Sequence, residues 1–136
     1  DNLYVSWKDG TTYGIDITDT NKAIGVYESL EFDNKRPEST KKFYTIKIVS
    51  KTLGTGCKIE VEYKTNRDTD WIKCSMSEED ETGDRREEME AGDKIGIFNA
   101  EAEGESYQVR VTLTPSGNTA PEIYSINNYF EQGEPL

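Results

Sequence analysis

Short apolar and polar runs alternate along the chain, and the period of that alternation predicts strands almost everywhere. The clearest run is 57–64, whose apolar members share one face while charged residues occupy the other; these members are Cys57, Ile59, Val61 and Tyr63. Such a pattern is typical of an antiparallel strand with one buried and one solvated face. Residues 106–114 repeat the pattern, with aromatic and β-branched residues at every second position.

Other short runs rich in β-branched and aromatic residues predict further strands, at 3–7, 12–17, 24–32, 42–51, 71–76, 94–98 and 122–131. The dipeptide Asp9-Gly10 predicts a hairpin turn between the first two of these strands. We expect 71–76 to return beside 57–64 as its hairpin partner. Within 42–51, a period of two places Tyr44, Ile46 and Ile48 on one face.

The segment 77–90 is different, because it is dense in acidic residues and carries no apolar stripe. Gly83 interrupts it and Gly92 follows it, so a regular helix is not expected there. We predict a long mobile loop. No other segment combines a helical period with capping residues.

Many short antiparallel strands separated by turns predict an all-β domain. We expect a two-sheet antiparallel β-sandwich of jelly-roll-like form, preceded by a short N-terminal hairpin. The polar linker after the hairpin divides the chain into 1–20, the hairpin and the possible end of a preceding repeat domain, and 21–136, the sandwich. Because residues 3–7 already predict a strand and the chain begins at Asp1, we expect a piece of a longer polypeptide.

Composition excludes several classes of function. The net charge of −11 repels phosphate backbones, so nucleic-acid binding is not expected. No apolar run approaches the roughly 18 residues that a membrane helix needs. Histidine, the commonest general base near neutral pH, is absent. No Gly-x-Ser-x-Gly motif occurs, and nothing singles out a pair of carboxylates for glycoside hydrolysis. We therefore expect no enzyme.

The sequence gives little indication of a disulfide or of a metal site. Cys57 and Cys74 can form a disulfide if their strands lie side by side, and two small, partly buried free thiols are the preferred interpretation. Two cysteines without histidine are too few for a structural zinc site. Two acidic clusters, 16–19 and 78–81 with Asp84, are rich in the oxygens that calcium prefers, but neither matches an EF-hand loop. We predict no metal and no cofactor.

Several elements of the chain, taken in order, resemble those of one known family. Residues 7–16 resemble the closing hairpin of a repeat domain such as a β-propeller, and 24–33 resemble the first strand of a following sandwich. The further motifs of this resemblance are the lysine-led strand at 41–47, the glycine turn and Tyr-ending strand at 54–63, the following Trp71, the strand at 107–113 and the Pro-bearing loop before 122–130. Together these elements resemble a long bacteriophage tail or virion structural protein. The acidic segment 77–90 departs from the pattern.

This resemblance implies a non-catalytic module of a virion, in a tail, fibre or capsid-associated protein. Its partners would be other virion structural proteins or copies of itself. Similar strand and turn patterns recur in carbohydrate-binding jelly rolls and discoidin-like domains, so the alternative function is adhesion to a host-surface glycan. For that alternative the candidate ligand-binding residues are aromatic: Trp71, Tyr124 and Tyr129. Alternation places Trp71 on a polar, outward face, and places Tyr124 and Tyr129 on opposite faces of the last strand.

Overall fold

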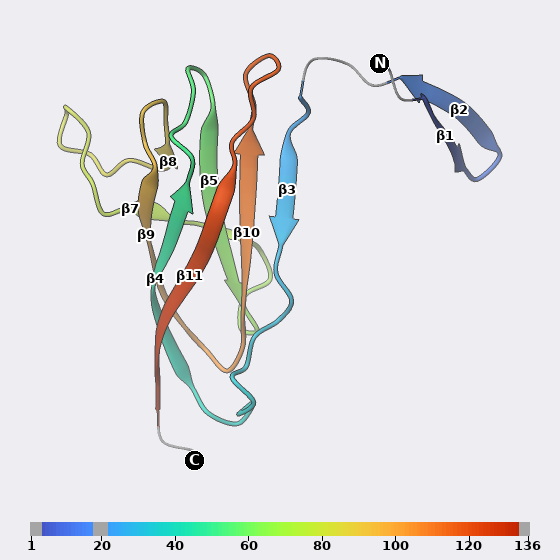
Figure 1. The fold of residues 1–136 in the computed structure, drawn as a ribbon. Coiled ribbons are helices and arrows are strands. Elements are labelled where there is room, and N and C mark those ends of the chain that lie inside the picture. Colours follow the sequence, from blue (N-terminus) through green and yellow to red (C-terminus); the bar gives the residue numbers. More distant parts are fainter. Residues whose placement is uncertain (1–3, 18–21, 134–136) are drawn as a thin grey trace.

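The computed structural model describes residues 4–17 and 22–133, and within these the chain is all-β (Figure 1). The strands in chain order are β1 (Tyr4–Asp9), β2 (Thr12–Ile17), β3 (Gly25–Glu28), β4 (Lys41–Ser50), β5 (Lys58–Thr65), β6 (Ile72–Lys73), β7 (Ser75–Met76), β8 (Glu88–Met89), β9 (Ile95–Gly104), β10 (Tyr107–Thr114) and β11 (Ile123–Gln132). None of the described residues forms a helix that is long and apolar enough to cross a membrane.

The predicted hairpin is present. Strands β1 and β2 pair antiparallel from Tyr4–Ile17 to Asp9–Thr12, and they form a two-stranded sheet of their own. Gly10 adopts a φ of 58° in the turn, a conformation that glycine takes without steric cost. The expected boundary between 1–20 and 21–136 falls at residues outside the described ranges.

The remaining strands build two antiparallel sheets that pack face to face. The β5 sheet has the order β3-β10-β5-β6, with the short β8 also paired to β5. The β4 sheet has the order β11-β4-β9-β7. The prediction of an all-β antiparallel sandwich is confirmed, and its jelly-roll connectivity stays a prediction.

The core lies between the inner faces of the two sheets. Strands β5 and β10 contribute Ile59, Val61, Tyr63, Tyr107, Val109 and Val111, as their alternation predicts. Strands β4 and β9 supply the opposite wall. At one end the core is aromatic, because the rings of Phe43 and Tyr107 stack with centroids 3.9 Å apart. Burial of apolar side chains from both sheets is the main source of stability in such a sandwich.

The prediction for the face of β4 is wrong at its first residues. Phe43 is buried together with Ile46 and Ile48, whereas Tyr44 is exposed. The cause is a register shift: the ladder to β9 passes from the pair Phe43–Ala102 to the pair Thr45–Asn99. A bulge changes the side-chain phase of a strand, and no period-two pattern reveals it.

The segment 71–76 is not one hairpin strand. Its first part, β6, pairs with β5, whereas β7 pairs with β9 in the other sheet. Cys74 lies at the crossing, where its N–H donates to the carbonyl of Val61 over 2.9 Å. The break explains why Ile72 is exposed although Met76, which alternation placed on the same face, is buried.

The acidic segment 77–90 is not an unpaired loop over its whole length. Its end forms β8, which pairs Met89 with Ile59 of β5. Met89 is fully buried in the core. A single apolar residue in a charged run carries no periodic signal, so the sequence pattern missed this strand.

Candidate functional site

The outer face of the β5 sheet is covered by ion pairs. Arg110 of β10 donates to Glu62 over 2.7 Å and lies 3.5 Å from Glu28 of the edge strand. Lys73 lies 2.9 Å from Glu60 and 3.1 Å from Glu87. A face of this kind is well solvated, and several of its charges have partners, although Val26 of the edge strand is also exposed on it.

The outer face of the β4 sheet carries exposed apolar side chains instead. Ile95 and Ile97 of β9 point outward, because the alternating Gly96 and Phe98 point into the core. Ile95 lies beside Val49, which in turn lies beside Ser125 of β11. We name the group Val49, Ile95, Ile97, Tyr124 and Tyr129 the outer apolar face. Lys47 lies between Ile97 and Asn127 on this face, so the apolar groups are gathered there without forming one continuous patch. Exposed apolar groups that gather on one face are candidates for contact sites.

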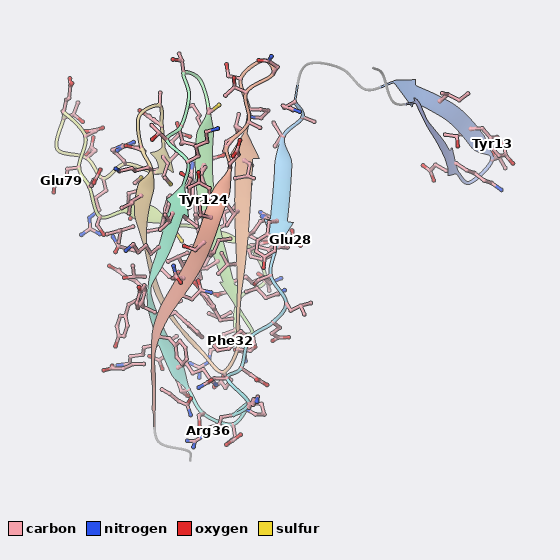
Figure 2. The ribbon with its side chains drawn as sticks, in the orientation of Figure 1. Tyr13, Glu28, Phe32, Arg36, Glu79 and Tyr124 are labelled. Atoms are coloured by element: carbon pink, nitrogen blue, oxygen red, sulfur yellow. The ribbon has the colours of Figure 1, made fainter. Side chains whose placement is uncertain are left out.

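Two of the predicted ligand-binding residues, Tyr124 and Tyr129, lie on β11 and contribute to this surface. Figure 2 shows Tyr124 on this strand. They are 68% and 54% exposed. The prediction that they occupy opposite faces, with one exposed, is wrong. A register shift between Ile123 and Ser125 adds Tyr124 as an extra residue, and so turns it outward.

Beside Tyr129 lies a groove of about 330 Å³. Five consecutive residues of β11, from Ile126 to Phe130, line it together with Phe32. Because successive residues of a strand point to opposite faces, a cavity lined by five in a row lies along the edge of the strand. We call it the edge groove.

The wall opposite β11 in this groove is held in place. Phe32 exchanges two backbone hydrogen bonds with Tyr107, of 2.8 and 3.0 Å. Its ring meets that of Phe130 edge-on, with centroids 5.4 Å apart. Figure 2 shows Phe32 towards the lower end of the sandwich and Tyr124 higher, on β11. The groove is thus a preformed surface with an aromatic floor and the amides of Asn127 and Asn128 at its rim.

The third predicted residue, Trp71, is not brought to this surface. It precedes β6 in the other sheet and is half-buried. The guanidinium carbon of Arg110 lies 4.6 Å from the centroid of its ring. This cation–π contact covers one face of the indole, which leaves less of it for stacking on a ligand.

Of the two acidic clusters that were candidates for binding calcium, the structure describes only one in full. The cluster 16–19 extends beyond the described residues. In the cluster near Asp84, the Asp80 carboxylate accepts hydrogen bonds from the hydroxyl and N–H of Thr82 and from the N–H of Asp84. The bonds from Thr82, above all, hold the pKa of Asp80 below its ordinary value. Across the two described ranges, no group of three or more acidic or cysteine side chains is placed to hold a metal ion.

Another cavity, of about 400 Å³, is acidic, because Glu31, Asp33 and Glu105 are among the residues that line it. Each carboxylate already accepts a hydrogen bond inside the protein. Ser106 donates its hydroxyl proton to Glu31, and the N–H of Lys35 donates to Asp33 over 2.8 Å. Arg67 and Asn66 donate to Glu105 over 3.1 and 2.9 Å, and they lower the pKa of that carboxyl to about 2. The cavity is therefore a structural hydrogen-bond network.

Replacing Arg67 by alanine should raise the pKa of Glu105 from about 2 towards its ordinary value of 4.5. A carboxyl whose pKa is lowered in the folded state stabilises the fold above its unfolded pKa, and this contribution is lost as the pH falls through 4.5 towards 2. A titration of the side-chain carboxyl by NMR measures the shift. Arg85→Ala, an exposed change elsewhere, should leave the pKa of Glu105 as it is, and an unchanged value in Arg67→Ala would contradict the assignment.

Both cysteines are free and buried, as preferred from the sequence. Each side chain is 1% exposed. Burial raises the pKa of the Cys74 thiol to about 12, so the reactive thiolate is scarce at neutral pH. Such a thiol behaves as a small apolar core residue.

We expect neither thiol to react with an aromatic disulfide reagent while the protein is folded. Both should react fully once denaturant unfolds the chain, because access and thiolate formation are then restored. Absorbance of the released thiolate measures the reaction. Rapid modification of one thiol in the native protein would mean that the crossing at Cys74 opens locally.

The sequence pattern did not single out several residues of the outer apolar face and the edge groove. These residues are Phe32, Ile95, Ile97, Asn127 and Asn128. Ile95 and Ile97 carried a usable signal, since both alternate with Phe98 in a short apolar run. Phe32 carried none, because its place depends on a bridge to Tyr107, far along the chain.

In comparisons with known proteins, no family model matches the chain, and neither a curated protein nor a solved structure does.

Proposed function

We propose that this domain is a non-catalytic structural module that binds neighbouring polypeptides through its outer apolar face. The observation that carries the proposal is the contrast between the two sheets. Ile95, Ile97, Tyr124 and Tyr129 are exposed on one side, while on the opposite side the ion pairs of Arg110 and Lys73 leave Val26 of the edge strand exposed beside them. Apolar and aromatic side chains contribute most of the binding energy in protein interfaces.

The chain's chemistry supports a contact function over a catalytic one. It contains no histidine, and its two thiols are buried. The further proposal that the neighbours are virion proteins of a bacteriophage rests on the order of strands and turns in the sequence. In that setting the domain would hold a shape and position adjacent subunits.

A photo-cross-linking residue placed at Ile97 tests the contact. In assembled particles that contain the protein, we expect it to link the domain to one defined neighbouring polypeptide. The same residue placed at Thr112, on the outer face of the β5 sheet, is the matched control and should give little product. Equal yields at both positions would contradict the proposal, as would a particle in which the Ile97 position links to nothing.

A second candidate function is glycan binding at the edge groove. It is favoured by one arrangement: exposed Tyr129 beside the amides of Asn127 and Asn128. An aromatic ring offers an apolar face to a sugar, and amides hydrogen-bond its hydroxyls. On a glycan array, binding that is lost in Tyr129→Ala but kept in Tyr44→Ala and Trp71→Ala would support this function. An array without binding would argue against it.

A further inference from the structure

Strand β11 is a long edge strand that lacks the usual charged protection. It pairs with β4 on one side, and no other strand of the described residues pairs with its second side. Its sequence is IYSINNYFEQ, in which Glu131 is the one charged residue, although 32% of the whole chain is charged. Edge strands normally carry charges, above all lysine, or are very short, because their free N–H and C=O groups are ready to pair with another strand.

Two bulges divide β11 and leave a regular stretch between them. The register with β4 shifts between Ile123 and Ser125, and again between Tyr129 and Phe130. From Ser125 to Tyr129 the pairing is uninterrupted. This stretch is centred on Asn127, which faces outward opposite Lys47. Bulges disrupt pairing at a sheet edge, so a new strand can add only along the regular part.

We propose that the occupant of this edge is β11 of a second copy of the chain, paired antiparallel about a two-fold axis at Asn127. The β4 sheets of the two copies then form one continuous sheet. An isologous contact of this kind uses the same patch twice, so the patch must complement itself. The proposal deepens the contact function above by naming a second partner surface, which shares Tyr129 with the outer apolar face but leaves Ile95 and Ile97 of β9 free.

The side chains of the regular stretch are self-complementary in this pairing. On the outer face Ser125 lies opposite Tyr129, and Asn127 lies opposite its own copy. On the inner face Ile126, which packs against the core of its own copy, lies opposite Asn128. Glu131 lies outside the stretch and faces Ile123, so no two acidic residues lie directly opposite. Cross-strand pairs without like charges are the stabilising ones.

Charge also indicates how association depends on salt. Each copy carries a net charge of −11, so two copies repel at long range although their edges are nearly neutral. Screening weakens that repulsion over a distance of about 10 Å at 0.1 M salt. The dimer should therefore become tighter as salt is added, unlike a contact built on ion pairs.

Sedimentation equilibrium of the whole chain tests the pairing. Wild type should reach a dimer at high protein concentration and high salt. Asn127→Glu and Asn127→Lys should each raise the dissociation constant about tenfold or more, because each places two like charges at the two-fold axis. Asn127→Glu retains a partner within its own copy, since Lys47 lies opposite. An equimolar mixture of the two variants should dimerise again, because opposite charges then meet.

Asn118→Glu makes the same charge change in an exposed loop and should dimerise like wild type. Circular dichroism reports whether each variant keeps its strands. A wild type that stays monomeric at the highest soluble concentration would overturn the proposal, as would Asn127 variants that each dimerise as tightly as wild type. A mixture that stays monomeric would also overturn it. None of these outcomes bears on cross-links from Ile97, so failure here is distinguishable from failure of the proposed function.

Discussion

Replacing Phe43 by alanine should lower the free energy of unfolding by about 3–5 kcal/mol, the usual cost of removing a buried phenylalanine. Phe43 is 1% exposed, and its ring stacks on Tyr107 with a centroid distance of 3.9 Å. The centroid of its ring also lies 6.0 Å from that of Phe130 on the neighbouring strand β11. Phe43 therefore links its own sheet, through Phe130, to the other sheet, through Tyr107, at the aromatic end of the core. The loss of the ring leaves a cavity between two strands that cannot easily close over it.

Tyr44 is the matched control for this change. It is the next residue, but it faces solvent and its hydroxyl donates to Glu131 over 2.7 Å. Tyr44→Ala should cost less than about 1 kcal/mol, as is usual for exposed positions. Equilibrium denaturation of both variants measures the difference. A larger loss of unfolding free energy in Tyr44→Ala than in Phe43→Ala would mean that Tyr44 faces the core, as a strict period of two predicts. The bulge in β4 would then be wrongly placed.

Replacing Lys41 by methionine should lower the free energy of unfolding by about 3 kcal/mol or more. Lys41 is fully buried, and its ammonium group donates to the carbonyls of Arg36, Ser39 and Glu105 over 2.8, 2.9 and 2.7 Å. These hydrogen bonds tie the loop before β4 to the turn between β9 and β10. Methionine fills a similar volume but leaves three carbonyls without their shared donor, and that loss exceeds the gain from removing a buried charge.

Lys42→Met is the matched control, because Lys42 is exposed and lies opposite Glu103 and Glu131 in the two ladders. It should change stability by less than about 1 kcal/mol. Thermal or urea unfolding of the two variants measures the difference. Equal stability of Lys41→Met and wild type would show that the three carbonyls find water or other donors when the ammonium is absent.

The alternation of the sequence predicted much of the sandwich correctly. It placed Ile59, Val61 and Tyr63 of β5 in the core, and it placed Tyr107 and Val109 of β10 there too. These strands pair with one another in an unbroken register, so a period of two holds from end to end. Where the ladder is regular, side-chain direction follows from sequence alone.

The candidate site was predicted only in part, because bulges decided it. Tyr124 and Tyr129 were chosen as candidate ligand-binding residues on opposite faces, but the shift between Ile123 and Ser125 turned Tyr124 outward, so that both are exposed. Trp71 was chosen for its polar neighbours, yet its own ring lies against Arg110 of another strand. Phe32, which closes the edge groove, meets β11 only through the pairing of distant segments.

By itself the sequence determined the fold class, the hairpin at Asp9-Gly10 and the faces of the regular strands, because these depend on local turn chemistry and on a period of two. It also determined the chemistry available, with no histidine and a net charge of −11. Only the tertiary structure decided which side chains the two outer faces expose. Ion pairs between neighbouring strands occupy much of one outer face, while a register shift turns Tyr124 outward on the other, and both depend on residues far apart in the chain that no local pattern connects.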